Sequence, residues 1–261
     1  MNPTRLIRIA LIMIAALAGA VTVPMAAETA PVGDKPKSWD WTGYYVLART
    51  RALQGTGLQP VNEDLDKTII AHLQPWAKMK MEATDGNADD TGALCKPDGI
   101  FRNPPFAGRF LWLPAKDRIA IVFHEINTAG VHRIYLNRPH PKNLLPKWNG
   151  DSVGHWEGDT LVADTIGFND KSWLMSAMEP HTEETHMIER IRSVLGGKYI
   201  EIVTVVEDRH ALTSAYTYTR YYKKQDSIEP PENICADDLS EWRAWHDAAL
   251  KKQIDASKVV K

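Results

Sequence analysis

The chain has 261 residues, with 31 lysines and arginines against 33 aspartates and glutamates, and a formal net charge of −2 at pH 7. Basic and acidic residues are interspersed and form no basic patch, which argues against nucleic acid or an anionic membrane surface as a partner. The length suffices for one large domain or two small ones with a substantial core.

Residues 1–27 have the features of a secretory signal peptide. Two arginines precede an apolar run from Ile9 to about Val23, and small residues follow up to Ala27. The apolar run is shorter than the ~20 residues that span a bilayer, which disfavours the alternative of a retained membrane anchor. We therefore expect a periplasmic or secreted protein, without stable membrane insertion after cleavage near Ala27.

Two cysteines, Cys95 and Cys235, are the number expected for one disulfide in an oxidising compartment. The alternatives are two free buried thiols or one reactive cysteine. Neither residue has a helix N-terminus or a basic cluster beside it that would activate a thiolate, so the pattern favours the disulfide.

Residues 28–61 are predicted to be an irregular arm, because prolines and glycines interrupt any long element. The arm also carries tryptophans and tyrosines, so we expect it to pack on the single domain formed by residues 62–261. From Asn62 to about Ala83, apolar residues recur at three- and four-residue steps, which predicts a helix. Pro75 predicts a kink or a break within it.

Beyond this helix the pattern becomes that of β-strands joined by short turns. Short turns join antiparallel neighbours, because a parallel crossover needs a dozen or more residues. The predicted fold class is mainly β, an antiparallel barrel-like meander of about eight strands flanked by the N-terminal helix and by a C-terminal amphipathic helix at about 238–257. The predicted strands are Arg109–Leu113, Arg118–Phe123, His132–Leu136, Ser152–Glu157, Thr160–Thr165, His186–Val194, Tyr199–Glu207 and Tyr216–Tyr222.

Carboxylates and imidazoles are densest between Gly150 and Glu189, which suggests acid–base catalysis in a barrel cavity. Histidine titrates near pH 7, and a desolvated glutamate can have its pKa raised into the same range. His186 and Glu189 lie on opposite faces of an ideal strand, so both reach the interior only through a bulge or if His186 belongs to the preceding loop. The alternative is a buried hydrogen-bonded network that braces the 166–185 loop. The candidate catalytic residues are His181, His186, Glu189, His140 and Glu125.

The strand faces also suggest a ligand cavity. In AYTYTRYY (215–222), tyrosines and an arginine alternate with threonines, so neither face is uniformly apolar. Mixed aromatic and polar lining is typical of a small-molecule site, although Arg190 and Arg192 on a neighbouring strand fit solvent-facing ion pairs better. The candidate ligand-binding residues are Trp156, Tyr135, Arg133, His155 and Tyr218.

Two further chemistries are weaker alternatives. His181, His186 and Glu189 give an H-x4-H-x2-E spacing suited to zinc or iron, but it matches neither the HExxH helix nor a His-x-His strand pair. We therefore expect no cofactor and keep a metal as the alternative. Ser152 lies in GDSVG, which resembles a nucleophile elbow, but the following residues read as a β-hairpin rather than a helix, so the match is interpreted as accidental. Glu157-Gly158-Asp159 fits a tight hairpin turn anchored by Trp156.

The segments WEGDTLVADTIGFND (156–170) and PHTEETHMIERIR (180–192) resemble a large family of exported, mostly uncharacterised bacterial proteins. The resemblance covers roughly residues 73–236 and carries no family-wide catalytic assignment. His155 stands where an arginine is more usual in that family, and Arg209–His210 stands where the family tends to have an Asp-Pro turn. The upstream matches are Glu125, Arg133, Ile134, Tyr135, Arg138, Pro139, His140 and Pro141.

The leading hypothesis is a cofactor-independent acid–base enzyme, a lyase or isomerase, that acts on a small apolar or aromatic compound in the barrel cavity. The alternative is a non-catalytic, lipocalin-like binding protein. A metal-dependent enzyme using His181, His186 and Glu189 is the second alternative. In each case the expected partner is a small molecule, and the sequence carries no signal for the oligomeric state.

Overall fold

The computed structural model describes residues 41–59, 65–86, 88–92, 94–106, 108–123, 130–226 and 251. All of them belong to the compact unit Pro31–Lys261, whereas the unit Met1–Ala30, with the predicted signal peptide, lies outside the described residues. The predicted C-terminal helix lies outside them as well, apart from Lys251. Cys95 is not a free thiol, but Cys235 is not described, so the disulfide between them stays a prediction.

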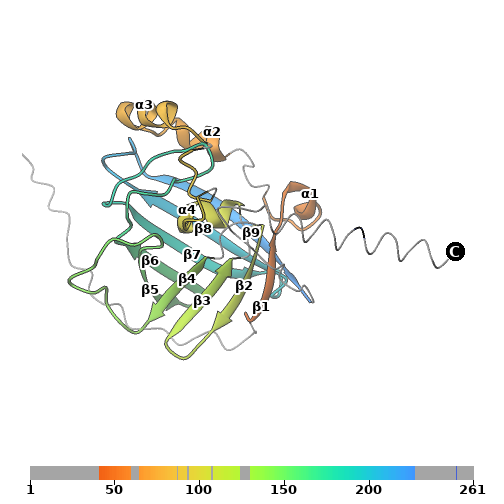
Figure 1. Ribbon diagram of the computed structural model, residues 1–261. Coiled ribbons are helices and arrows are strands. Elements are labelled where there is room, and N and C mark those ends of the chain that lie inside the picture. Colours follow the sequence, from red (N-terminus) through yellow and green to blue (C-terminus); the bar gives the residue numbers. More distant parts are fainter. Residues whose placement is uncertain are drawn as a thin grey trace, which may run out of the picture. The chain divides into compact units, whose positions relative to one another are not determined.

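Nine strands form a closed barrel in the order β1 to β9 (Figure 1). Every strand predicted from the sequence is present, as β2 to β9, which confirms the mainly β fold. The strands are β1 (Gly43–Leu47), β2 (Arg109–Pro114), β3 (Arg118–Phe123), β4 (Val131–Leu136), β5 (Asp151–Glu157), β6 (Thr160–Ile166), β7 (His186–Val194), β8 (Tyr199–Glu207) and β9 (Tyr216–Gln225).

The expectation of an irregular arm was wrong for β1. This strand pairs with β2 on one side and with β9 on the other, so it closes the barrel. Trp41 and Tyr45 of the arm are fully buried in the core. The run GYYVL is too short to show a clear alternation, and its partners lie more than 60 residues away in sequence, so local pattern could not reveal it.

The all-antiparallel expectation was also wrong. β4 and β5 pair in parallel, with Ile134 opposite Ser152, while the other neighbouring pairs are antiparallel. The connection 137–150 is long enough for the chain to return and run in the same direction, whereas the turns considered in the sequence were all short. The barrel is therefore mixed but mostly antiparallel.

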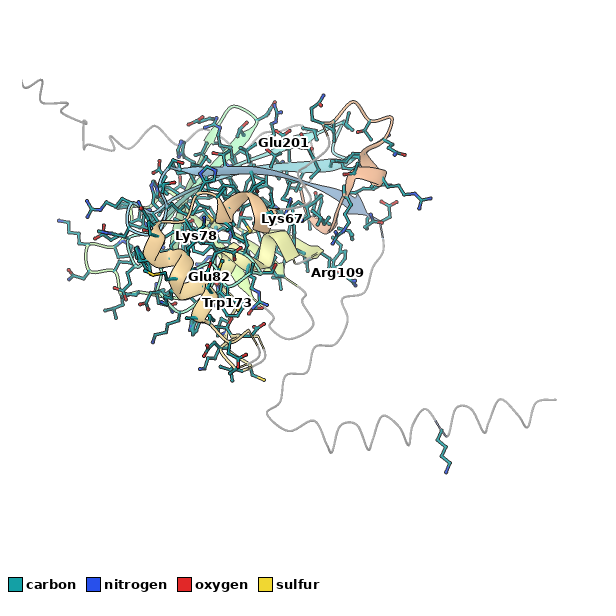
Figure 2. All side chains as sticks on the ribbon, turned by 90° about the horizontal axis from the view of Figure 1, so that it is seen from above. Lys67, Lys78, Glu82, Arg109, Trp173 and Glu201 are labelled. Atoms are coloured by element: carbon teal, nitrogen blue, oxygen red, sulfur yellow. The ribbon has the colours of Figure 1, made fainter. Side chains whose placement is uncertain are left out.

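Four helices occur in the described ranges: α1 (Thr50–Leu53), α2 (Leu65–Ile70), α3 (Pro75–Ala83) and α4 (Gly99–Phe106). The break predicted at Pro75 is confirmed, because Pro75 is the first residue of α3, where its missing N–H costs nothing. Lys67 of α2 and Lys78 and Glu82 of α3 are exposed (Figure 2). None of these helices is long and apolar enough to cross a membrane.

Aromatic side chains fill much of the barrel interior. Trp41 lies between Trp112 and Trp156, with ring centroids 5.2 and 5.4 Å away. The same core continues into α2 through Leu65 and Ile69, which are buried against it. Burial of these apolar side chains contributes to holding α2 on the barrel.

The strand register separates inner from outer side chains without a bulge in β7. The β6–β7 ladder runs unbroken from the Thr160–Arg192 pair to the Thr165–Met187 pair. Glu189 therefore faces the interior and His186 the exterior, as alternation predicts for an ideal strand.

Candidate ligand-binding site

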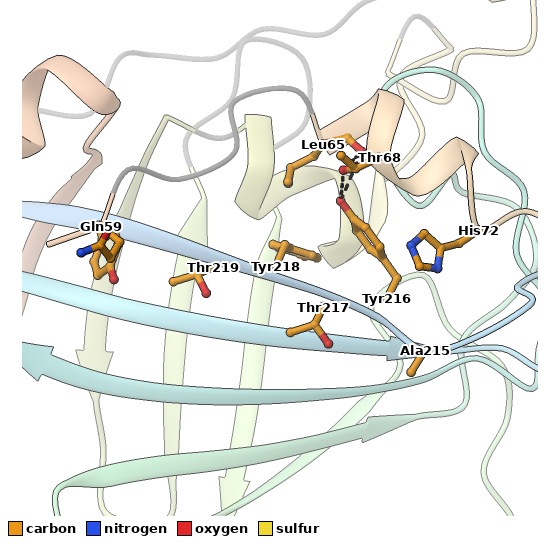
Figure 3. A pocket seen from close by; sticks show the side chains of 10 residues that line it. Gln59, Leu65, Thr68, His72, Ala215, Tyr216, Thr217, Tyr218 and Thr219 are labelled. Carbon is orange, nitrogen blue, oxygen red and sulfur yellow. Dashed lines mark hydrogen bonds between the residues drawn. The ribbon is translucent and has the colours of Figure 1, made fainter.

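A pocket of about 530 Å³ lies between α2 and the first half of β9 (Figure 3). Its volume is within the range of small-molecule sites. Among the residues that the structure describes, those that line the pocket include no aspartate, glutamate, lysine or arginine. They come from the segment around α2 and from β9 with its preceding turn, namely Gln59, Leu65, Thr68, His72, residues 215–219 and Tyr221.

Hydrogen bonds fix the wall that α2 contributes. The hydroxyls of Thr68 and Tyr216 lie 2.6 Å apart, and the Tyr216 hydroxyl also donates to the Leu65 carbonyl at 3.3 Å (Figure 3). His72 Nδ1 lies 2.9 Å from Ser214 Oγ, and its ring packs edge-on against Tyr216. These contacts join two segments almost 150 residues apart in sequence, so the pocket is built into the fold rather than left by a loop.

Tyr218 connects the pocket with the barrel interior. Glu189, Thr204 and Tyr218 lie in one row across β7, β8 and β9. Burial raises the pKa of Tyr218, and the neighbouring Glu189 raises it further, against a hydrogen bond with Thr204 that lowers it. Burial and the hydrogen bond with Glu201 raise the pKa of Tyr221 to about 12. Both phenols are therefore neutral at physiological pH.

A buried polar cluster lies inside the barrel. Thr165 Oγ1 donates to Ser152 Oγ at 2.8 Å, and Ser152 Oγ lies 2.8 Å from His132 Nε2. His132 Nδ1 faces Glu189 Oε2 at 3.5 Å, and neither of these two atoms has a hydrogen-bond partner. The separation would allow an ion pair, but both side chains are almost completely buried.

Burial keeps this pair neutral. Desolvation lowers the pKa of His132 to about 4 and raises the pKa of Glu189 to about 8, so at pH 7 the imidazole is unprotonated and the carboxyl is protonated. In space, Ser152, His132 and Glu189 follow one another in the order of a Ser–His–acid catalytic triad. A neutral acid cannot stabilise an imidazolium, however, and none of the three residues lines the pocket.

The four predicted catalytic residues that the structure describes do not form one site. His181 is buried in the 166–185 loop, where Nε2 lies 3.0 Å from Ser172 Oγ and Nδ1 lies 3.1 Å from Thr185 Oγ1. Burial lowers the pKa of His181 to about 4. These are the loop-bracing contacts of the alternative interpretation. Glu189 lies in the interior, and Glu125 is outside the described residues.

His140 and His186 belong to a chain of charges on the outer side of the barrel. His186 Nε2 lies 3.0 Å from Asp164 Oδ1, and His140 Nε2 lies 3.5 Å from the same oxygen. The other imidazole nitrogens contact Glu207 at 3.2 Å and Asp151 at 3.0 Å. The hydrogen bond with Asp164 raises the pKa of His186. For His140, burial opposes protonation, but its interactions with Asp164 and Asp151 outweigh it and raise the pKa.

Only one of the predicted ligand-binding residues, Tyr218, lines the pocket. Trp156 is in the aromatic core. Tyr135 lies under the guanidinium groups of two arginines, one of them 3.9 Å from its ring centroid. Arg133 is exposed, and His155 Nε2 contacts Glu157 at 3.1 Å on the outer face.

The structure brings no metal-binding group together in the residues it describes. No set of three or more histidine, cysteine, aspartate or glutamate side chains there is arranged to hold a metal ion. His181, His186 and Glu189 lie in the loop, on the outer face and in the interior. Ser152 lies within the continuous strand β5, so the helix that a nucleophile elbow needs does not follow it.

Sequence reasoning missed most of the pocket. The tyrosine and threonine alternation in β9 did signal it, but the partner segment around Thr68 and His72 was interpreted only as a helix. His132 was missed because a lone histidine in the strand VHRIYL gives no sign that its neighbour across the barrel is Glu189.

Comparison with known proteins adds little. No family model matches the chain, and neither does any curated protein. Among solved structures it is similar to a chain described as "REP1-NXSQ fatty acid transporter", with 9% sequence identity and a TM-score of 0.35 over 72% of this chain and 97% of that chain. A likeness this low supports no functional argument, and the resemblance of the motif segments to exported bacterial proteins stays a prediction.

Proposed function

We propose that this protein binds a small neutral molecule in the pocket between α2 and β9 and holds it without chemical change. The observation that carries the proposal is the pocket itself, about 530 Å³ in volume, whose described lining consists of rings, hydroxyls and other uncharged groups without a carboxylate, lysine or arginine. The signal-peptide pattern of residues 1–27 adds the proposed place of binding, the periplasm or the cell exterior.

The chemistry of the lining supports a ligand with an apolar or aromatic body and a few polar groups. Tyr216 and Tyr218 offer ring faces, and Leu65 offers an aliphatic surface. Thr68, Thr219 and Gln59 can donate and accept hydrogen bonds without carrying charge. An ionised ligand would lose its hydration and gain no opposite charge from these residues, so neutral compounds should bind more tightly.

A neutral fluorophore tests this proposal. N-phenyl-1-naphthylamine becomes bright in an apolar site and should bind the protein in the micromolar range, with displacement by neutral aromatic alcohols and amides. Thr219→Phe would place a ring in the pocket and should weaken binding at least tenfold. Lys223→Phe is the matched control, because Lys223 is an exposed residue on the same strand that does not line the pocket.

The outcome against the proposal is equally clear. Fluorophore binding that Thr219→Phe and Lys223→Phe leave unchanged would place the ligand elsewhere. No binding of the fluorophore or of any displacing compound, by a folded protein, would remove the binding function.

Acid–base catalysis is the second candidate, and one observation favours it. Glu189, kept neutral by burial, lies in the same row of side chains as the pocket-lining Tyr218, whose phenol can donate a hydrogen bond to a developing oxyanion of a bound compound. A compound that displaces the fluorophore should then be converted by the wild type. Glu189→Gln should convert it at least tenfold more slowly, and equal rates would exclude Glu189 from any reaction.

A further inference from the structure

β9 is longer than the strand that closes the barrel beside it. β1 pairs with β9 only between Tyr222 and Gln225, and the chain leaves the sheet at Ala48. The Ala48 N–H still donates to the Tyr221 carbonyl at 2.8 Å. The half of β9 from Tyr216 to Thr219 extends past this last bond, while β8 covers its other edge along its whole length.

The direction of the main-chain groups from Thr217 to Thr219 follows from the Ala48–Tyr221 bond. N–H and C=O groups of successive strand residues point to opposite edges. Since Tyr221 points toward β1, Thr219 and Thr217 also point to that side, and Tyr218 points toward β8. No contact in the described part of the chain satisfies the N–H or the C=O of Thr217 and Thr219.

The pocket lies against this free edge. Thr217 and Thr219 both line it, and Tyr216 and Tyr218 border it from the inner face of β9. A ligand in the pocket therefore contacts the N–H and C=O groups of Thr217 and Thr219. These groups are spaced as they would be for pairing with a neighbouring β-strand. Unpaired strand edges bind extended chains through such groups.

We propose that the ligand of this pocket is a short, extended, neutral peptide, which pairs with the main chain of Thr217 and Thr219 as an added strand. The inference rests on the proposed binding function and names its ligand class. Two edge-facing residues span about 7 Å, the reach of a three-residue segment. Hydroxyls and tyrosine rings flank the edge and can contact uncharged side chains of the peptide. None of the lining residues that the structure describes is a carboxylate, lysine or arginine that would select a charged side chain.

Hydrogen exchange followed by NMR tests the edge directly. In the free protein the amides of Thr217 and Thr219 should exchange much faster than the Tyr218 amide, which points to β8. The probe is the neutral peptide N-acetyl-Val-Tyr-Val-amide, and saturation with it should slow exchange at both threonines at least tenfold. Peptide binding that leaves both amides unprotected would overturn the added-strand geometry.

Backbone methylation of the probe separates main-chain recognition from side-chain recognition. One analogue is N-methylated at the central residue, and the other at the first and third residues, because alternate amides of a bound strand face β9. One of the two should bind at least tenfold more weakly than the parent peptide. Equal affinity of all three peptides would mean that the peptide forms no main-chain hydrogen bonds with the edge of β9.

A matched pair of variants makes the same test on the protein. Thr217→Pro removes the edge-facing N–H, at a position where proline breaks no bond to β8. Thr217→Val keeps the N–H and removes only the hydroxyl. The proline variant should lose at least tenfold in peptide affinity and the valine variant less than twofold, and equal affinities would refute the inference. If the proline variant fails to fold, the methylated peptides give the answer on the wild type.

The fluorophore distinguishes the two proposals. N-phenyl-1-naphthylamine binding that Thr219→Phe abolishes, together with no binding of the tripeptide at millimolar concentration, would reject the peptide class and keep the binding function. Absence of binding by both probes would reject both.

Discussion

The buried carboxyl of Glu189 makes a quantitative prediction about stability. Glu189 is about 2% exposed, and its burial raises its pKa from 4.5 to about 8. The pKa of Glu189 in the folded state lies above its value in the unfolded chain. Above pH 4.5 the carboxyl therefore ionises in the unfolded chain but not in the folded protein, and the free energy of unfolding decreases. The stability that the neutral carboxyl contributes is present below that pH and is lost as the pH rises through 8.

The magnitude follows from the two pKa values. One pKa unit corresponds to about 1.4 kcal/mol, so the penalty grows from about 1 kcal/mol at pH 5 to about 4 kcal/mol at pH 8. Glu189→Gln keeps the shape of the side chain, can accept a hydrogen bond from His132 Nδ1 and carries no charge. The variant should therefore gain about 3 kcal/mol in free energy of unfolding relative to wild type between pH 5 and pH 8.

Urea denaturation at pH 5, 6, 7 and 8 measures this difference. Glu157→Gln is the control, because Glu157 is the exposed last residue of β5 and pairs with Arg190 at 2.7 Å, a contact expected to contribute less than about 1 kcal/mol. A stability difference between Glu189→Gln and wild type that does not change with pH would show that Glu189 is ionised in the folded protein. The neutral His132–Glu189 pair would then be refuted.

Three further predictions concern stability measured by urea denaturation. The carboxylate partners of His186 raise its pKa, so the stability that the charged histidine contributes is present below about pH 6.5 and is lost as the pH rises through the folded-state pKa. His186→Gln should therefore cost up to about 1 kcal/mol at pH 5.5 and little at pH 9. Equal costs at the two pH values would contradict the ion pairs of His186. Gly150 has a φ of 61°, and an added Cβ would lie 2.7 Å from the Ile166 carbonyl oxygen. Gly150→Ala should therefore destabilise the protein more than the control Gly158→Ala, where φ is 60° and no atom lies within 4 Å of the added Cβ. The control should cost only the ~1–2 kcal/mol of a left-handed backbone, and similar costs for both variants would argue against the close packing at Gly150. Tyr45→Ala should cost about 3–5 kcal/mol if β1 closes the barrel, and a cost below about 1 kcal/mol would place β1 outside it.

The strands of this fold could be predicted because each carries its own pattern. In β7 the alternation places Met187, Glu189 and Ile191 on one face, which identifies the strand, but Glu189 on that face and Ile188 on the other hid which of the two is the inner face. The turn at Gly158, with φ of 60°, is likewise local, and so is the helix start at Pro75. These features depend on residues a few positions apart.

What could not be predicted depends on contacts distant in sequence. β1 is a strand because Tyr44 and Tyr45 find partners in β2 and β9, and the parallel β4–β5 pair depends on the path of the 137–150 connection. The pocket joins Thr68 to Tyr216 across 148 positions. Local pattern gives the type of an element, but strand order and pocket walls follow from tertiary packing.

The candidate site shows the same division. The concentration of histidine and glutamate was visible in the sequence, but it spans the inner and outer faces of one sheet and a loop. His181 braces the loop, His186 pairs outside the barrel, and Glu189 faces inward. Residues close in sequence were separated by strand alternation, whereas His132 and Glu189, 57 positions apart, face each other at 3.5 Å.

Two-dimensional NMR of the ¹⁵N-labelled protein during titration with N-phenyl-1-naphthylamine tests the central claim most directly. Amide shifts should concentrate in α2 and in residues 215–221 of β9, which form the two walls of the pocket. Shifts confined to the outer face around His140 and His186, or spread evenly over the barrel, would contradict a binding site between α2 and β9.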